Sequence, residues 1–205
     1  MRKFKFFIDK SKEEKWLNNM AQKGYELINV SAGYTFMPAK PKNTTIKIDY
    51  RTFKNKEDFI DYCTLFEDSG WKHITGNKSS GAQYFKSLNE NSEDDIFSDA
   101  ISKAAKYKRL SQMWVNLAIA YFPILVALIA TETIDINVIF NPKLLYITQG
   151  LWEKSGNSFW KAFLLEIPFA FLRGFMWLFI PVMIILYLLF AYRAQMLYEK
   201  NKNSI

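Results

Sequence analysis

The sequence predicts an α+β cytosolic domain with a duplicated β-α-β-β order, followed by an α-helical membrane domain with two spans. Two uncharged apolar stretches, residues 112–130 and 175–192, indicate the membrane domain. At about 1.5 Å per residue, each would extend roughly 27–28 Å as a helix, close to the thickness of a bilayer's hydrocarbon core. A repeated order of strand, helix and hairpin in residues 1–90 indicates the cytosolic domain.

The first unit begins with residues 3–8, where Phe4, Phe6 and Ile8 alternate with other residues as in a half-buried strand. A helix is expected over about residues 9–23, because its apolar residues recur at helical spacing. The glycine at position 24 is typical of a helix C-terminal cap. Residues 25–31 and 33–37 then predict a hairpin.

The second unit repeats this order. Residues 45–52 alternate as a strand, and a helix is expected from about Lys56. Gly70 follows that helix as a glycine follows the first one. A second hairpin is expected from residues 71–75 and 83–86. The shared order and spacing favour a structural duplication.

Residues 91–111 are expected to form an amphipathic linker helix, with Ser92 and Asp95 resembling a capping box. Its basic face suits either lipid headgroups or a docking partner. Residues 131–174 are expected to be external or interfacial. Within them, residues 159–172 are too short to span comfortably, so an interfacial or re-entrant helix is favoured over a third span.

Lysine and arginine are denser before the first span and after the second than between them. The positive-inside rule therefore places both termini, including a tail of residues 193–205, in the cytoplasm. We expect a multi-pass protein of the cell membrane, with the lipid bilayer as a partner. The flanking basic residues are Lys103, Lys106, Lys108 and Arg109 before the first span, and Arg193, Lys200 and Lys202 after the second.

The sequence offers little for catalysis or metal binding. Its single cysteine, Cys63, excludes an intramolecular disulfide framework and a multi-cysteine metal site. Its single histidine, His73, has no neighbouring metal-ligating histidine. We interpret both Cys63 and His73 as structural residues. No phosphate-binding loop, dinucleotide fingerprint, nucleophile elbow or zinc-protease motif occurs. We therefore expect that the protein is not an enzyme and has no cofactor. Despite its net charge of +7, we also expect that it has no nucleic-acid partner.

Residues 1–90 are rich in aromatic side chains. Trp16 and Trp71 occupy equivalent places in the two units and are expected in the core. A domain of this size buries only about 60% of its unfolded surface, so some rings should line an exposed groove for a small apolar ligand or protein segment. The alternative is that the rings fill two small cores or face the membrane surface. The candidate binding residues are Tyr25, Tyr34, Tyr50 and Tyr84.

Three polar residues are candidates in the membrane half. Glu166 and Arg173 lie in the apolar approach to the second span, where they either reach the outer interface or form a buried polar site. Asn116 either bonds across a helix pair or lies at the cytosolic edge. No ionisable residue lies inside either span, which is unlike most transporters and proton relays.

The most specific motif is Trp-Leu-Asn-x-Met-Ala-x-x-Gly, within residues 13–27. With residues 33–36, 47–50, 70–71 and 84–86, it resembles a family of unknown function from Gram-positive bacteria. Members are often encoded beside PadR-type transcriptional repressors and commonly carry C-terminal membrane helices. The resemblance covers about residues 1–90, and it implies a membrane protein under PadR control without assigning a catalytic residue. The strand and helix order also resembles the duplicated ligand-binding domains of the GyrI type.

These observations favour a non-enzymatic integral membrane protein with a regulatory or sensing role. Its cytosolic domain would bind a small apolar ligand or a protein, and a homo-oligomer is left open. One alternative is a membrane-stress or antimicrobial-immunity protein that acts through its external apolar segment. The other is an accessory subunit of a transporter.

Overall fold

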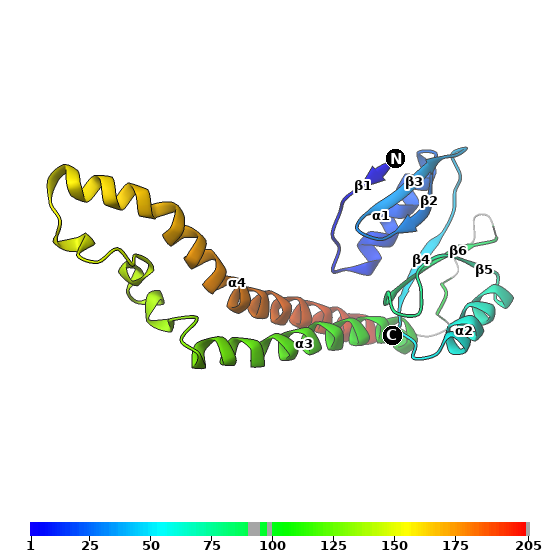
Figure 1. Ribbon diagram of the computed structural model, residues 1–205. Helices are drawn as coiled ribbons and strands as arrows, with labels where there is room; N and C mark the ends of the chain where they lie inside the picture. The colour runs from blue at the N-terminus through cyan, green and yellow to red at the C-terminus, as the bar shows by residue number, and fades with distance from the viewer. Residues whose placement is uncertain (90–94, 98–99, 204–205) are drawn as a thin grey trace. The chain divides into compact units, whose positions relative to one another are not determined.

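The computed structural model describes residues 1–89, 95–97 and 100–203 (Figure 1). The chain divides into two compact units. The first unit comprises Met1–Gln112 together with Phe190–Ile205, and the second comprises Met113–Leu189.

The first sheet contains β1 (Arg2–Lys3), β2 (Tyr25–Val30) and β3 (Tyr34–Pro38), in the antiparallel order β1-β3-β2. Helix α1 (Lys10–Gln22) precedes the hairpin, as the sequence predicts. Its first turn is capped because the Asp9 carboxylate accepts a hydrogen bond from the Ser11 N–H at 3.0 Å. The chain leaves the helix through Gly24, whose φ of +81° favours glycine.

The predicted strand over residues 3–8 is wrong beyond Lys3. Strand β1 pairs with β3 only through Arg2 with Thr35 and Lys3 with Tyr34. Further antiparallel pairing would bring the chain past the first residue of β3 into the hairpin turn. Residues 4–8 therefore have no partner strand, and Phe4 and Phe6 are 73% and 64% exposed.

The second sheet contains β4 (Ile46–Tyr50), β5 (Trp71–Thr75) and β6 (Ala82–Ser87), in the antiparallel order β4-β6-β5. Helix α2 (Lys56–Asp68) lies between β4 and β5 in sequence. Each sheet thus places its first strand beside its third, and each has its helix between the first and second strands. That the two halves are a duplication remains a prediction.

The two sheets share a hydrophobic core. Helix α1 contacts both β2 and β4, and Leu17 on this helix is fully buried. A smaller cluster forms around Trp71, Tyr62 and Phe85, so the core placement of Trp71 is confirmed. Trp16 is only half-buried and packs edge-on against Tyr34 at 4.8 Å between ring centroids. The shared core comprises Leu17, Met20, Leu27, Tyr34, Phe36, Ile46, Ile48 and Tyr84.

The start of helix α3 (Ala100–Ala130) is partly buried, whereas the sequence predicts that the linker helix lies on the surface. Helix α3 includes both the end of the linker and the first apolar stretch. The expected capping residue Ser92 lies outside the described residues, and residues 95–97 are not helical. Ala104, Lys106 and Tyr107 are buried within the first unit. These side chains therefore pack against the α+β domain, and the interpretation as an amphipathic helix at lipid headgroups is wrong for them.

The second unit joins its two apolar helices through three short 3₁₀ helices, η1 (Ile136–Ile139), η2 (Pro142–Leu145) and η3 (Leu151–Glu153). Helix α4 then runs without a break over Gly156–Lys202. Residues 159–172 are thus the first part of α4 and not a separate helix. Their position at the membrane interface stays a prediction. Pro168 and Pro181 lie inside α4, where a proline removes a backbone hydrogen bond without necessarily ending the helix.

Helices α3 and α4 are long and apolar enough to cross a membrane. Only 6% of the most apolar window in α3 and 11% of that in α4 is buried within the protein, whereas a core helix would be mostly buried. At about 1.5 Å per residue, the 47 residues of α4 extend roughly 70 Å, so part of this helix lies beyond any single hydrocarbon core.

Candidate functional site

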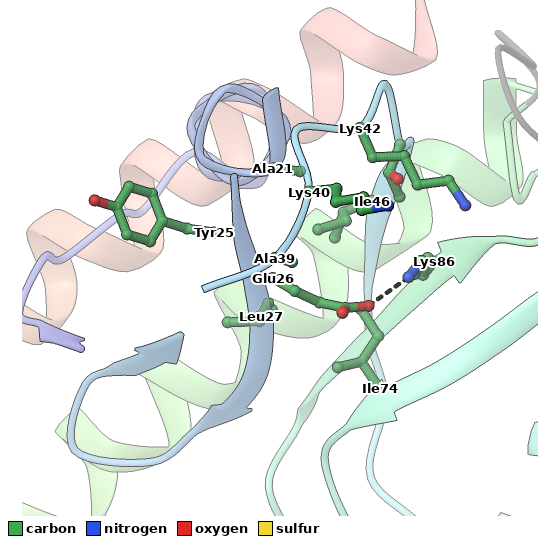
Figure 2. A pocket seen from close by; sticks show the side chains of 11 residues that line it. Ala21, Tyr25, Glu26, Leu27, Ala39, Lys40, Lys42, Ile46, Ile74 and Lys86 are labelled. Atoms are coloured by element: carbon green, nitrogen blue, oxygen red, sulfur yellow. Dashed lines mark hydrogen bonds and ion pairs between the residues drawn. The ribbon is translucent and has the colours of Figure 1, made fainter. Parts of the chain in front are cut away.

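A pocket of about 250 Å³ lies between the two sheets of the first unit (Figure 2). Its apolar lining includes Leu27 of β2, Ile46 of β4 and Ile74 of β5. Segment 39–44, which leads from β3 toward β4, forms another part of the wall. Because both sheets contribute, a molecule in this pocket would contact both.

The pocket has a positively charged rim. Lys40, Lys42 and Lys86 line it together with one carboxylate, Glu26, which gives these residues a formal charge of +2. The Lys86 ammonium lies 2.5 Å from the Glu26 carboxylate, and this ion pair joins β6 to β2 (Figure 2). Both side chains are partly exposed, so an anion could compete with Glu26 for Lys86 at modest cost.

Strand β4 leads from this pocket to a set of buried polar contacts. Ile46 lines the pocket, and its N–H donates to the Asn18 side-chain oxygen at 2.8 Å. Two residues further along, the Ile48 N–H donates to the Glu14 carboxylate at 3.1 Å. The edge of β4 that does not pair with β6 is therefore satisfied by side chains of α1.

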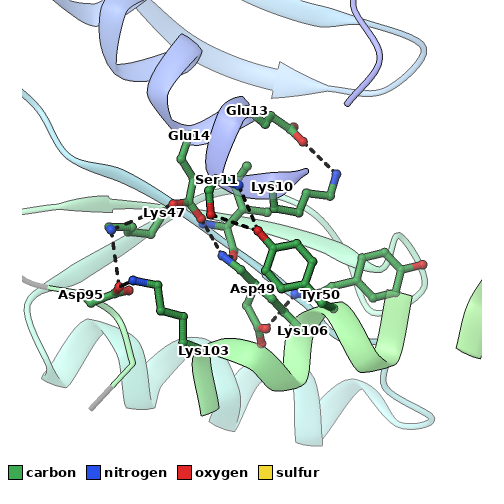
Figure 3. A network of polar contacts seen from close by, with 12 residues as sticks. Lys10, Ser11, Glu13, Glu14, Lys47, Asp49, Tyr50, Asp95, Lys103 and Lys106 are labelled. Atoms are coloured by element: carbon green, nitrogen blue, oxygen red, sulfur yellow. Dashed lines mark hydrogen bonds and ion pairs between the residues drawn. The ribbon is translucent and has the colours of Figure 1, made fainter. Parts of the chain in front are cut away.

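Lys106 of α3 joins this arrangement from a third element (Figure 3). Its ammonium lies 2.8 Å from the Glu14 carboxylate and donates to the Ile48 carbonyl at 3.1 Å. The Lys106 side chain is 2% exposed and that of Glu14 is 10% exposed. A buried charge needs a partner, so this lysine holds α3 firmly against α1 and β4.

Two neighbours of Lys106 extend the contact. The Tyr107 hydroxyl donates to the Asp9 carboxylate at 3.1 Å, at the capped start of α1. The Arg109 guanidinium lies 2.6 Å from the Asp49 carboxylate, and it also donates to the Tyr50 carbonyl. We name Lys106, Tyr107 and Arg109 with their carboxylate partners Glu14, Asp9 and Asp49 the α3 joint.

Asp49 also links the joint to α2. Its carboxylate accepts a hydrogen bond from the Tyr62 hydroxyl at 3.0 Å, and Asp49 itself is buried. Burial, followed by the nearby Asp49 charge, raises the pKa of Tyr62 well above its usual range. The phenol therefore stays protonated and keeps donating at all ordinary pH values.

Two of the four candidate tyrosines are core residues. The Tyr34 and Tyr84 hydroxyls both donate to the same oxygen of buried Glu13, at 2.8 and 2.6 Å. Burial, and then the Glu13 charge, raises the pKa of both phenols far above the ordinary value. Lys10 pairs with the other Glu13 oxygen at 2.8 Å. These contacts satisfy Glu13 within the core and leave both tyrosine hydroxyls engaged.

The other two tyrosines lie apart from each other. Tyr25 belongs to the pocket wall, but its ring points away from the Glu26–Lys86 pair in Figure 2. The Tyr50 ring packs so closely on Gly81 that an added Cβ there would lie 2.5 Å from it. This pocket therefore does not bring the four tyrosines together. The pocket between the sheets is lined by aliphatic side chains and lysines, with Tyr25 as the single tyrosine among its lining residues.

In the second unit, Glu166 and Arg173 of α4 form hydrogen bonds with the backbone of residues 145–148. Glu166 is 5% exposed and accepts hydrogen bonds from the Ile147 N–H at 2.5 Å and the Thr148 N–H at 3.1 Å. Arg173 donates to the Leu145 carbonyl. Residues 145–148 therefore cover Glu166. The placement of Glu166 and Arg173 at the outer interface or in a buried polar site stays a prediction. Asn116 is exposed on α3, and its role remains a prediction.

His73 is positioned as a structural residue. Its Nε2 lies 3.1 Å from the Gln83 side-chain oxygen, and its ring packs edge-on against Phe59 and Phe85. Cys63 lies beside the same small core. Burial, and then the Glu67 charge, raises the pKa of the Cys63 thiol, which disfavours the reactive thiolate.

The His73 environment predicts a pH dependence of stability. Burial lowers the pKa of His73 below its usual value, although Gln83 and Glu67 act in the opposite direction. As the pH falls through about 6.5, the unfolded chain gains a proton that the folded chain resists, so stability falls. We expect the unfolding midpoint to drop more between pH 7.5 and 5.5 in the natural protein than in His73→Gln. Equal drops would contradict this prediction.

Sequence reasoning missed the polar residues that matter most here. Glu13 lies four residues before Leu17 and seven before Met20, a spacing that places all three on one helix face. That spacing was the available signal for a buried carboxylate. Asp49 gave no such signal, because strand alternation assigned it to a solvent face. Across the described residues, no group of three or more His, Cys, Asp or Glu side chains could hold a metal ion.

Comparisons with known proteins give one match. The family of proteins of unknown function DUF2812 matches residues 9–119, which is more than half of the 205-residue chain. No curated protein and no solved structure matches the chain. The matched range exceeds residues 1–90, where the sequence motifs lie, and it contains both sides of the α3 joint, from Asp9 to Arg109. The chain therefore belongs to the DUF2812 family of proteins of unknown function.

Proposed function

We propose that this protein is a non-enzymatic integral membrane sensor. In this proposal, the pocket between the two sheets binds a small amphipathic anion, and the α3 joint passes its occupancy to the first membrane span. The apolar walls would hold a short hydrocarbon tail, and the lysine rim would hold its charged group. Transmission would begin when the anion competes with Glu26 for Lys86, which alters the link between the sheets.

The observation that carries this proposal is the course of β4. One end of this five-residue strand lines the pocket at Ile46, and the other contacts α3 through Ile48, Asp49 and Tyr50. The two places are separated by only about 7–14 Å of extended chain. A rigid strand with both edges hydrogen-bonded is suited to carry a displacement over that distance, provided that the ligand prefers one arrangement of the sheets.

The membrane part of the proposal rests on the two long apolar helices. Because they are hardly buried within the protein, a lipid bilayer is the environment that would cover them. The density of basic residues supports a cytosolic α+β domain with both termini in the cytoplasm. Residues 1–90 resemble a protein family of Gram-positive bacteria whose members are often encoded beside PadR-type repressors. We therefore also propose that a PadR-type repressor controls production of this protein and that its source is a Gram-positive bacterium.

Isoleucine methyl NMR of the full chain in lipid nanodiscs tests the sensor. We expect hexanoate to cause saturable shifts of the Ile46 and Ile74 methyl signals, because both side chains line the pocket. Hexylammonium has the same tail with the opposite charge, and it should cause much weaker shifts. Signals from Ile28, which does not line the pocket, should stay constant.

Matched lysine variants separate pocket binding from general attraction to a basic protein. Lys86→Gln should weaken hexanoate binding severalfold, because it removes a cation from the rim. Lys72→Gln removes an exposed lysine of β5 outside the pocket and should leave binding unchanged. Equal responses to hexanoate and hexylammonium, or equal effects of the two substitutions, would refute the anion-binding pocket.

A further inference from the structure

Residues 2–8, which we name the N-terminal arm, expose an unusual combination of side chains. Phe4 and Phe6 are 73% and 64% exposed. They alternate with Lys3 and Lys5, which are also exposed, and no acidic residue occurs before Asp9. Large exposed aromatic rings among cations are uncommon on a surface that faces only water.

The arm lies against the end of the apolar part of α4. The Phe6 and Phe190 rings are 5.5 Å apart between centroids, and both belong to the first unit. A shallow groove of about 560 Å³ runs between the arm and the last turns of α4, where it is lined by Arg193 and Met196. Phe190 lies two residues before the apolar stretch 175–192 ends, and Arg193 follows that stretch directly.

This position matches the chemistry of a membrane surface. If α4 crosses a bilayer, Phe190 and Arg193 mark the level at which the helix leaves the hydrocarbon core. Phe6 contacts Phe190, so the arm lies near the same level. Aromatic rings suit the boundary between hydrocarbon and headgroups, and lysines near that boundary attract anionic lipids.

We propose that the N-terminal arm is a separate membrane contact that binds the surface of an anionic lipid leaflet. Phe4 and Phe6 enter the interfacial layer. The Lys3 ammonium lies 3.7 Å from the Met20 sulfur and the Lys5 ammonium 5.2 Å from the Trp16 ring centroid, and on docking both turn to lipid phosphates. This inference rests on the membrane part of the proposed function, but not on the pocket between the sheets. A lipid surface is favoured over a protein partner because the exposed rings are continuous with an apolar helix and the neighbouring charges are positive.

The contact would also link lipid composition to the α3 joint. Lys5 lies over the Trp16 ring of α1, with its ammonium 5.2 Å from the ring centroid. The residue that follows the arm is Asp9, which caps α1 and accepts the Tyr107 hydrogen bond. Docking of the arm therefore acts directly on the start of α1, one of the three elements that the joint holds together.

Spin labels on the full chain in nanodiscs test this proposal. In a Cys63→Ser background, a nitroxide is attached at Phe4→Cys, at Leu65→Cys and at Leu186→Cys in separate samples. Leu65 is a matched control, because it is an apolar residue of α2 that is 64% exposed. Leu186 lies in the apolar stretch of α4 and reports whether that helix is in the bilayer. Collision with oxygen is compared with collision with a water-soluble nickel chelate.

With nanodiscs that contain phosphatidylglycerol, the label at position 4 should show a severalfold higher ratio of oxygen to nickel collisions than the label at position 65. Pure phosphatidylcholine, or the added pair Lys3→Gln and Lys5→Gln, should reduce that ratio. A water-exposed label at position 4 with a lipid-exposed label at position 186 overturns the arm proposal and leaves the span intact. A water-exposed label at position 186 overturns both. Strong spin–spin broadening at position 4 overturns the lipid contact in favour of a second copy of the chain.

Discussion

Replacement of Lys106 by methionine should lower the free energy of unfolding by about 3–5 kcal/mol, the typical cost of breaking a buried ion pair from one side. The substitution removes the nearer cation of the Glu14 carboxylate, which is 10% exposed, and leaves only the Lys47 ammonium at 4.0 Å among the ion pairs of the described residues. It also leaves the Ile48 carbonyl without that donor. Denaturant unfolding of the full chain, followed by the circular dichroism of the α+β domain, measures this loss.

Two variants show whether the effect comes from the buried pair. Glu14→Gln combined with Lys106→Met should recover much of the loss, because an amide oxygen can still accept the Ile48 N–H without carrying a charge. Lys103→Met removes a lysine whose side chain is 40% exposed and which pairs with Asp95, and it should cost at most about 1 kcal/mol. Similar losses in Lys103→Met and Lys106→Met would show that the joint is not the source of the stabilisation.

Replacement of Glu13 by alanine should have an effect of similar size. The Tyr34 and Tyr84 hydroxyls would both lose their acceptor inside the core. A buried polar group without a partner costs about 1–3 kcal/mol, so we expect a loss of roughly 2–6 kcal/mol in the free energy of unfolding. Glu13→Gln keeps an acceptor oxygen and should lose less.

The second half of the domain offers a control for this prediction. Glu57 follows Lys56 at the start of α2, and the repeated order aligns it with Glu13 of α1, but it is exposed. Glu57→Ala should therefore change stability by no more than about 0.5 kcal/mol. If both alanine variants unfold at the same denaturant concentration, Glu13 does not stabilise the core through its two tyrosine bonds.

The joint also explains why the family match continues past the α+β domain. Residues 9–119 include Asp9, Glu14 and Asp49 on one side and Lys106 and Arg109 on the other. The domain without the start of α3 would lose the Tyr107 hydroxyl that donates to Asp9, the Lys106 ammonium beside Glu14 and the Arg109 guanidinium beside Asp49. The matched range therefore includes the beginning of an apolar helix.

The local elements of this protein can be predicted from its sequence. Helices α1 and α2, both hairpins and the two long apolar stretches follow from helical spacing, glycine after a helix, strand alternation and uninterrupted hydrophobicity. Each of these signals lies within a short window of the chain, so no distant contact was needed to interpret it. The same reasoning failed for residues 4–8. A strand needs a partner, and β3 offers none beyond Lys3, because Lys3 already pairs with Tyr34, the first residue of β3.

Contacts between distant parts of the chain determine which charged residues are buried and which elements they join. Lys106 resembled a surface lysine of a linker, and Asp49 resembled the polar face of a strand, yet they are 2% and 3% exposed. Their partners Glu14 and Arg109 are 92 and 60 residues away in sequence. A charged side chain is stable in a core only when a partner of opposite charge lies beside it. Here the partner belongs to a distant part of the chain, which the periodicity of one segment cannot predict.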